Sequence, residues 1–429
     1  MGIQNRMLLS LTVILFAVAL VGISSTARGE SDEEALNKLK RIIEEQQDQI
    51  DAQQKTLQDL KQQVEAISEP STSPSPQVAE KKPEAVVRSR NDKVSLTIYG
   101  QVNRAALYAN DGDEGNWFFV DNDNSSTRIG LLGSTNAIDD FSIGTRFEVE
   151  FQTNPSNEVS QEDKNGVGDN NFKRRHFDIF VTSKRFGKLS LGYGSTASDN
   201  TAEVDLSGTD VVGYSSIADM AGGQFFFDND TDTLSNTSIN DVFANFDGIG
   251  RDDRLRYDTP DFYGFVASGS VISGDAADVA LRYSAKLGDF KLAAAAAYSD
   301  PAGNSNSVDD IIDGSISVLH GSGFSLTFAA GNEDYKVSGR DDGTLYYGKF
   351  GYQRKFFSIG TTAMSVDYGR NDDLDQNGDE ASTVGFQFVQ NIDQWATEYY
   401  LGYRYHNLDR DNTDFKDINA LMTGLRVKF

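Results

Sequence analysis

The chain has 429 residues and a formal net charge of -26, which argues against a nucleic-acid partner because phosphate contacts need clustered Lys and Arg. It contains no Cys, which excludes a disulfide scaffold, a thiol enzyme and a lipid-modified cysteine anchor. Beyond the N-terminal segment no apolar run approaches the roughly 20 residues of a membrane helix, so a helical membrane protein is excluded as well.

The first 27 residues have the pattern of an export signal. Arg6 precedes the apolar run MLLSLTVILFAVALVGI, and the small residues from Ser25 to Ala27 follow where a signal peptidase would cut. A retained membrane anchor is the alternative, but the apolar run is short and lacks a positively charged far flank. We therefore expect residues 1–27 to be a signal peptide and the mature chain to be exported.

Residues 28–68 carry a heptad pattern. Gln46 and Gln53 complete the a and d register, and Lys, Glu and Gln fill the positions between. A helix packed on its own domain would usually show a broader stripe at period 3.6, so the pattern favours a self-associating coiled coil. Three strands fit the pattern, but the sequence does not prove the number. The predicted apolar core positions are Leu36, Leu39, Ile43, Ile50, Leu57, Leu60, Val64 and Ile67.

Residues 69–93 contain four of the seven prolines and are expected to form an extended linker. From Val94 to Phe429 apolar and polar residues alternate in short runs, and this period of two predicts strands. We expect sixteen strands in this region. Their approximate starts are Val94, Arg128, Phe141, Arg174, Lys188, Asp253, Gly264, Asp278, Phe290, Ile312, Phe324, Thr344, Phe357, Ser382, Trp395 and Asp417.

The connections between these strands alternate in length. TPDFYG and HGSGF are short, whereas NDDLDQNGDEAS and residues 154–171 are long and acidic. Short turns at one end and long loops at the other are typical of an outer-membrane barrel. A soluble sandwich of this size would need two stacked cores and would not explain the asymmetry. The sequence predicts an all-β fold, a 16-stranded antiparallel transmembrane β-barrel preceded by an α-helical coiled-coil segment.

The chain ends in ALMTGLRVKF, in which Leu421, Leu425, Val427 and Phe429 share one face. We expect this last strand to close the barrel against the first. Its terminal aromatic residue, Phe429, is similar to the signal read by the barrel insertion machinery.

Several motifs carry a family resemblance in their order and spacing. LTIYGQVN, STRIGLLGS, RFGKLSLGYGS, LRYDTPDFYGF and YLGYRYHN follow one another between Val94 and Phe429. With Phe429, they resemble the trimeric general porins of Gram-negative bacteria. The resemblance implies three barrels per assembly, surrounded by outer-membrane lipid and lipopolysaccharide, each with a third loop folded into the pore. The coiled coil departs from most such porins, although some outer-membrane channels, including substrate-selective ones, are similar in carrying one on the periplasmic side.

The alternation of the strands predicts which side chains face the lumen. On the third predicted strand Phe141, Ile143, Phe147, Val149 and Phe151 would face lipid, so Arg146, Glu148 and Glu150 would point inward. Arg175 stays an alternative to Arg174, because a bulge would exchange the two. Arg128 and Arg256 match arginines of the family motifs. The predicted basic wall of the constriction is Arg128, Arg146, Arg174, Arg254 and Arg256.

The resemblance implies that carboxylates on the third loop, after Ser195, face this wall. For each of them an ordinary solvated loop position stays open. The candidates are Glu203, Asp205, Asp210 and Asp219.

Neither a cofactor nor an enzymatic site is expected. DLDQNG from Asp373 begins like a calcium loop, but Val384 stands where a bidentate Glu is required, so we predict no metal site and leave open weak Ca²⁺ binding by the acidic outer loops. The three histidines, His176, His320 and His406, have no recognisable Ser or Cys nucleophile around them.

The sequence therefore predicts a channel in the cell outer membrane of a Gram-negative bacterium, with its stalk in the periplasm. It would pass ions and small hydrophilic solutes by passive diffusion, with a modest cation preference. A substrate-selective channel is the alternative. A structural tether, whose stalk would contact peptidoglycan, is a less favoured one.

Overall fold

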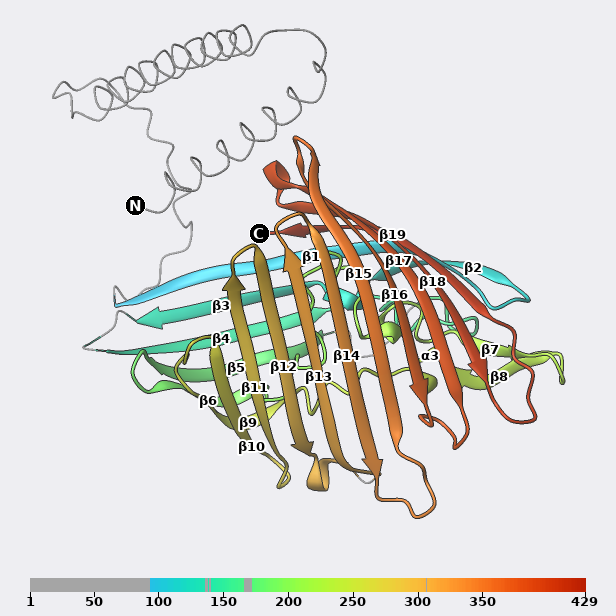
Figure 1. Ribbon diagram of the computed structural model, residues 1–429, viewed down its shortest axis with the longest axis horizontal. Helices are drawn as coiled ribbons and strands as arrows, with labels where there is room; N and C mark the ends of the chain where they lie inside the picture. Colours follow the sequence, from blue (N-terminus) through green and yellow to red (C-terminus); the bar gives the residue numbers. More distant parts are fainter. Residues whose placement is uncertain (1–92, 136–137, 139, 166–171, 306) are drawn as a thin grey trace, which may run out of the picture. The chain divides into compact units, whose positions relative to one another are not determined.

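The computed structural model describes residues 93–135, 138, 140–165, 172–305 and 307–429 (Figure 1). The predicted signal peptide, the coiled coil with its core positions and the linker, apart from its last residue, lie outside these ranges. None of the helices in the described part of the chain is long and apolar enough to cross a membrane.

The described residues form one antiparallel sheet of 17 strands that closes on itself. Because β2 and β3 lie end to end beside β1, the wall has sixteen positions, as predicted. The strands of the wall are β1 (Val94–Asn110), β2 (Gly115–Asp121), β3 (Arg128–Thr135), β4 (Phe141–Phe151), β5 (Phe172–Ser183), β6 (Gly187–Ser195), β9 (Arg251–Asp258), β10 (Phe265–Ile272), β11 (Ala277–Leu287), β12 (Phe290–Asp300), β13 (Val308–His320), β14 (Phe324–Tyr335), β15 (Gly343–Phe357), β16 (Gly360–Asp372), β17 (Glu380–Ile392), β18 (Thr397–Asp409) and β19 (Ile418–Lys428).

The predicted strand starts lie within four residues of those in the structure. The sequence missed the interruption between β2 and β3, where the chain forms the short helix η1 (Asp123–Ser125). The connections alternate as expected. Residues 184–186, 288–289 and 358–359 form short turns at one end, whereas residues 152–165, the described part of the connection from β4 to β5, and residues 196–250 belong to long loops at the other.

The barrel closes where β1 pairs with β19, from Gln101 opposite Lys428 to Asn110 opposite Asn419. At the chain terminus, the backbone N–H of Phe429 donates to the Gly100 carbonyl at 3.0 Å, and the Gly100 N–H donates back at 2.9 Å. This pairing confirms that the last strand seals the barrel against the first.

The third loop, residues 196–250, folds into the barrel and contains secondary structure of its own. It holds η2 (Ile217–Asp219), the hairpin of β7 (Phe225–Asp228) and β8 (Thr233–Ser238), and the helical turn α3 (Ile239–Val242). Three further short helical turns, η1, η3 (Ala302–Asn304) and η4 (Asp393–Trp395), lie outside this loop.

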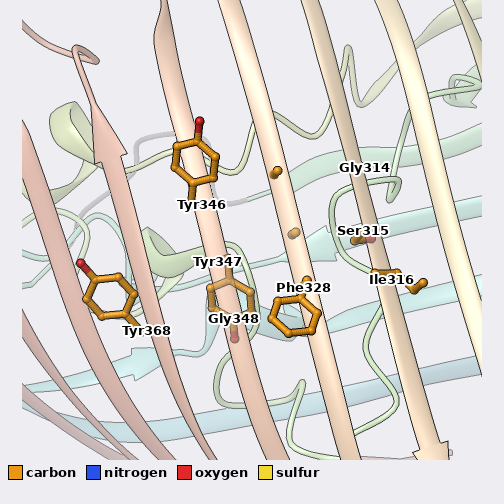
Figure 2. A pocket seen from close by; sticks show the side chains of 10 residues that line it. Gly314, Ser315, Ile316, Phe328, Tyr346, Tyr347, Gly348 and Tyr368 are labelled. Carbon is orange, nitrogen blue, oxygen red and sulfur yellow. The ribbon is translucent and has the colours of Figure 1, made fainter.

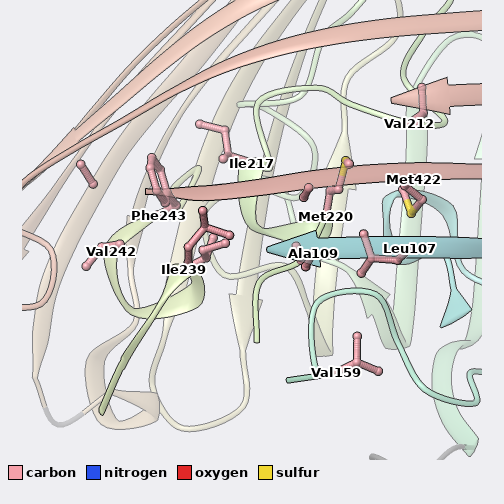
Figure 3. Packing of buried hydrophobic residues seen from close by; sticks show 14 of the residues in the cluster. Leu107, Ala109, Val159, Val212, Ile217, Met220, Ile239, Val242, Phe243 and Met422 are labelled. Atoms are coloured by element: carbon pink, nitrogen blue, oxygen red, sulfur yellow. The ribbon is translucent and has the colours of Figure 1, made fainter. Parts of the chain in front are cut away.

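The loop packs its apolar side chains against one side of the barrel interior. Ile217 and Met220 of the loop belong to the same buried cluster as Leu107 and Met422 of the wall, and Figure 3 shows these four among its members. Burying a side chain of this size contributes roughly 1.5–3 kcal/mol. The apolar cluster thus fills part of a lumen that the sequence had suggested to be polar. Loop members of the cluster include Val211, Val212, Ile217, Met220, Phe226, Ile239, Val242, Phe243 and Phe246, and wall members include Leu107, Leu345, Tyr347, Tyr400, Leu408, Ile418 and Met422.

A buried ion pair anchors the loop to β15. The Lys349 ammonium lies 2.7 Å from Asp205 and also donates to the Gly213 carbonyl at 2.7 Å. Both charged side chains are almost fully buried, at 0% and 3% exposure. Removing one partner of such a pair leaves an uncompensated buried charge, which costs about 3–5 kcal/mol.

We therefore expect Lys349→Met to loosen residues 205–213 from the wall, which should raise the single-channel conductance and its fluctuation and lower the unfolding temperature of the barrel. The double variant Lys349→Met with Asp205→Leu should recover most of the stability, because no buried charge is left unpaired. Planar-bilayer recordings and thermal unfolding of the purified protein measure both effects. Unchanged conductance and unfolding in the single variant would show that the pair does not hold the loop.

Candidate functional site

A polar cavity of about 530 Å³ lies inside the barrel, between the third loop and the wall formed by β3, β4, β5 and β9. Bases line it from the wall, and acids line it mainly from the third loop and the connection between β2 and β3. The charged residues around it are Asp123, Arg128, Glu150, Lys173, Arg175, Asp199, Glu203, Asp219, Asp247 and Arg251.

The bases of the wall differ in how far their charge is compensated. Arg175 binds two carboxylates, those of Glu148 at 2.8 Å and Glu150 at 2.6 Å. Arg251 lies 3.5 Å from Asp199. Arg128 donates to the Ser126 carbonyl and the Ser125 hydroxyl, and within the described ranges it forms no ion pair. Arg128 is therefore the base whose charge acts most fully on the cavity.

The acids of the opposite side are held by neutral donors. Glu203 accepts from the Asn245 amide at 2.9 Å. Asp219 accepts from the Tyr214 hydroxyl at 2.7 Å and from Ser216 at 2.8 Å.

Asp247 accepts the backbone N–H groups of Asn200 and Ala202, at 2.6 and 2.9 Å, and Asp123 accepts from the Gln152 amide. Among the residues that the structure describes, Asp123, Glu203, Asp219 and Asp247 form no ion pair with Lys or Arg. Four acidic side chains thus face the cavity without a Lys or Arg partner among the described residues.

The surroundings of these acids favour their neutral forms. Burial, and after it the charge of Asp123, raises the pKa of Asp219 to about 7. Burial and the charge of Asp199 raise the pKa of Asp247 to about 6. Burial together with Asp247 raises the pKa of Glu203 well above its ordinary value. The negative charge of this side therefore changes near neutral pH.

Of the predicted constriction residues, Arg128, Glu203 and Asp219 line this cavity. Arg146, Arg254 and Arg256 line a second cavity of about 200 Å³. There, Arg254 binds Asp178 at 2.7 Å, and Arg256 binds both Asp258 at 2.6 Å and the Thr196 carbonyl at 2.5 Å. Arg256 therefore fixes the start of the third loop.

The placement of Arg174 inside the pore is wrong. A bulge in β5 lets Glu148 pair with His176 and Val149 with Arg174, so Arg175 takes the inward position. The Arg174 guanidinium instead stacks over the Tyr193 ring, 4.0 Å from its centroid, and lies 3.6 Å from the exposed Asp253.

Two of the predicted loop acids also lie away from the cavity. Asp205 points to the wall, where Lys349 neutralises it. Asp210 is exposed and does not line the cavity. Sequence reasoning in turn missed Lys173, Arg251, Asp123 and Asp247. Asp123 and Asp247 lie in loops, where no alternation predicts which side chains face the cavity. For Lys173 the run of three bases KRR at residues 173–175 was a signal, because a bulge there turns Lys173 inward.

The outer wall of the barrel, in contrast to the charged interior, carries apolar grooves. One of them has a volume of about 560 Å³. Its lining residues, shown in Figure 2, include Phe328, Tyr346 and Tyr368 and the small residues Gly314 and Gly348. Strand alternation puts these five residues on the outward face, opposite the inward Tyr347. The groove offers apolar contact, whereas charge is concentrated inside the barrel.

A closed barrel with an apolar exterior and a charged interior cavity defines the class of outer-membrane channels. Residues 70–411 match the family of Gram-negative porins, and the chain belongs to this family. The protein is a porin channel of the outer membrane, and its family and fold are those of a non-enzymatic channel protein.

Solved structures agree on the fold. An anion-selective porin from Comamonas acidovorans is similar with a TM-score of 0.52 and 14% identity, covering 78% of this chain and 100% of that one. A loop L8 deletion mutant of OmpT, an outer membrane protein of Vibrio cholerae, is similar with a TM-score of 0.52 and 14% identity, covering 79% and 100%. No curated protein matches the sequence.

The raised pKa values predict a pH-dependent selectivity. Ordinary carboxylates titrate near pH 4 and stay ionised between about pH 8 and about pH 5. Asp219 and Asp247 should gain protons as the pH falls through their pKa values of about 7 and about 6. The cation-to-anion permeability ratio, measured from reversal potentials in a salt gradient, should therefore fall over this range. The change should be smaller in Asp219→Asn, and a constant ratio in the wild type would contradict the assignment.

Proposed function

We propose that the protein is a passive diffusion channel for ions and small hydrophilic solutes with a modest preference for cations. The observation that carries this proposal is the imbalance of charge around the cavity. Asp123, Glu203, Asp219 and Asp247 have no cationic partner in the described ranges, whereas Arg128 alone of the four lining bases has no carboxylate partner there.

The physical reason is electrostatic. A passing cation exchanges part of its hydration for the field of these carboxylates, and the opposing arginine limits the gain. Acidic loops at the mouth add to the local cation concentration. Because salt screens such fields over about 10 Å at 0.1 M, the preference should be stronger in dilute salt.

This proposal predicts opposite effects for the two sides of the cavity. A unit charge about 10 Å from an ion in water changes its energy by about 0.4 kcal/mol, or about twofold in partitioning. At pH 8, above the pKa values of about 7 and about 6 of Asp219 and Asp247, Arg128→Gln should raise the cation-to-anion permeability ratio by about that factor, and Asp247→Asn should lower it. Asp210→Asn, which removes a charge from the same loop outside the cavity, should leave it unchanged. An anion-selective wild type, or equal ratios in all variants, would refute the proposal.

We also propose a homotrimer whose periplasmic coiled coil, residues 28–68, extends from the barrels after removal of the signal peptide, residues 1–27. The heptad pattern supports this arrangement, because a parallel three-stranded coil can share its axis with three barrels. Lipid and lipopolysaccharide would cover the apolar outer wall, the insertion machinery would read Phe429, and the stalk could contact peptidoglycan.

Weak Ca²⁺ binding by the acidic outer loops stays a proposal. Arg410 lies 2.6 Å from both Asp375, within DLDQNG, and Asp379, directly after it, which reduces the negative charge of this loop.

The role of the heptads can be tested by deletion. Without Glu33 to Ile67 the barrel should still fold, but the oligomer should dissociate at a lower temperature and detergent concentration, because the apolar stripe of the coil is lost. Ile43→Asp with Ile50→Asp should act alike, whereas Asp48→Asn, at an outward heptad position, should not. Native gels and light scattering measure the oligomer. Unchanged resistance of the deletion variant would show that contacts between barrels suffice.

A further inference from the structure

The cavity holds polar atoms that no described residue satisfies. Asp199 is 5% exposed, yet its Oδ2 atom has no hydrogen-bond partner, and the nearest Arg251 nitrogen lies 3.5 Å away. The Nε–H of Arg251 has no acceptor, and the side-chain oxygens of Asn124 and Asn157 have no donor. All four residues line the same cavity. Unpaired buried polar groups are rare and costly, so a polar solute is the natural partner.

The two sides of the cavity can bind different chemical groups of that solute. Arg128 and Arg251 offer N–H donors that match a carboxylate. Opposite them, Asp123, Glu203, Asp219 and Asp247 have no Lys or Arg partner in the described ranges. A positively charged solute beside them would favour their ionised forms, so this side matches more than one positive group. The volume of about 530 Å³ is within the range of small-molecule sites.

The spacing of the acids argues against a single metal ion. Within the described ranges, the one group of three acids close enough to share an ion is Asp309, Asp310 and Asp334, which lies elsewhere. No three acids of the described cavity lie that close together, so a solute with more than one positive group matches them better than a single ion.

Tyr214 is the one aromatic side chain among the lining residues, and its hydroxyl is engaged by Asp219. Ten of the lining residues are charged, so charge dominates recognition in this cavity.

We propose that the cavity is a saturable binding site for α-amino acids with a cationic side chain. The carboxylate of the solute faces Arg128 and Arg251, and its two positive groups face Glu203, Asp219 and Asp247. This inference rests on the proposed diffusion channel, since the solute reaches the site along the pore. Because these solutes bind in the cavity, their flux through the channel should saturate as their concentration rises, whereas the flux of neutral solutes should not.

Three probe molecules of nearly the same length separate the contribution of the solute carboxylate from that of its side-chain ammonium. Lysine carries all three charges, norleucine lacks the side-chain ammonium, and cadaverine lacks the carboxylate. In planar bilayers, lysine should reduce the single-channel ion current in a saturable manner. Norleucine and cadaverine should each need a roughly tenfold higher concentration for the same block, because each loses a charge-assisted contact.

Variants test whether the acidic side of the cavity binds the positive groups of the solute and the basic side binds its carboxylate. Glu203→Gln should weaken the block by lysine and by cadaverine more than the block by norleucine. Arg251→Gln should weaken the block by lysine and by norleucine while leaving that by cadaverine unchanged. Asp210→Asn and Arg354→Gln, which remove the same charges outside the cavity, should change none of the three. Heat-resistant migration of each variant on gels establishes that it has folded.

Each outcome supports or overturns the inference. If cadaverine blocks as strongly as lysine, the basic side of the cavity does not bind the carboxylate. If norleucine blocks as strongly as lysine, the acidic side does not bind the side-chain ammonium. Either result overturns the inference. Ion conductance without a saturable lysine block would also overturn it while leaving the diffusion channel intact, whereas a wild type that folds but conducts no ions would refute the channel itself.

Discussion

The packing of the third loop against one side of the barrel interior determines where everything else can lie. Ile239 on α3 and Phe243 directly after it, with Ile217 and Met220 earlier in the loop, bury their side chains against inward-facing residues of the wall. Because this apolar contact excludes water, the described polar space inside the barrel is displaced toward β3, β4, β5 and β9. The pore is thus shaped by hydrophobic burial on the side opposite to the charged cavity.

The same packing separates two kinds of acid along one loop. The backbone N–H groups of Val204 and Leu206 donate to serine hydroxyls of β13, which fixes this segment on the wall. Glu203, on one side of the segment, lines the cavity with a neutral partner, whereas Asp205 is buried with Lys349. A charge in the contact needs its own counter-ion, and a charge in the cavity is free to act on solutes.

The strands could be predicted from the sequence because alternation is a local rule that each strand repeats. It located sixteen wall positions, and it placed Arg146 and Arg256 inside. The rule fails at a bulge, as Arg174 and Arg175 show, since one inserted residue reverses every side chain beyond it. It is silent for the loop, where Asp247 reaches the cavity through contacts with Asn200 and Ala202 that are distant in sequence. Nor did the sequence predict that Leu107 and Met422 would pack against the loop inside the barrel, because a polar lumen was expected there.

The uncompensated carboxylates oppose the stability of the barrel, which is itself an argument for their use. A carboxyl group whose pKa is higher in the folded state than in the unfolded chain binds protons more tightly when folded, so the free energy of unfolding falls as the pH rises through that range. With pKa values of about 7 and about 6, Asp219 and Asp247 weaken the fold at and above neutral pH. Neutral amides of the same shape would avoid this loss. These acids weaken the fold, and the apolar packing of the loop offsets their cost while it keeps them facing one cavity. Their presence is therefore better explained by an interaction with the solutes that pass through the cavity than by a contribution to stability.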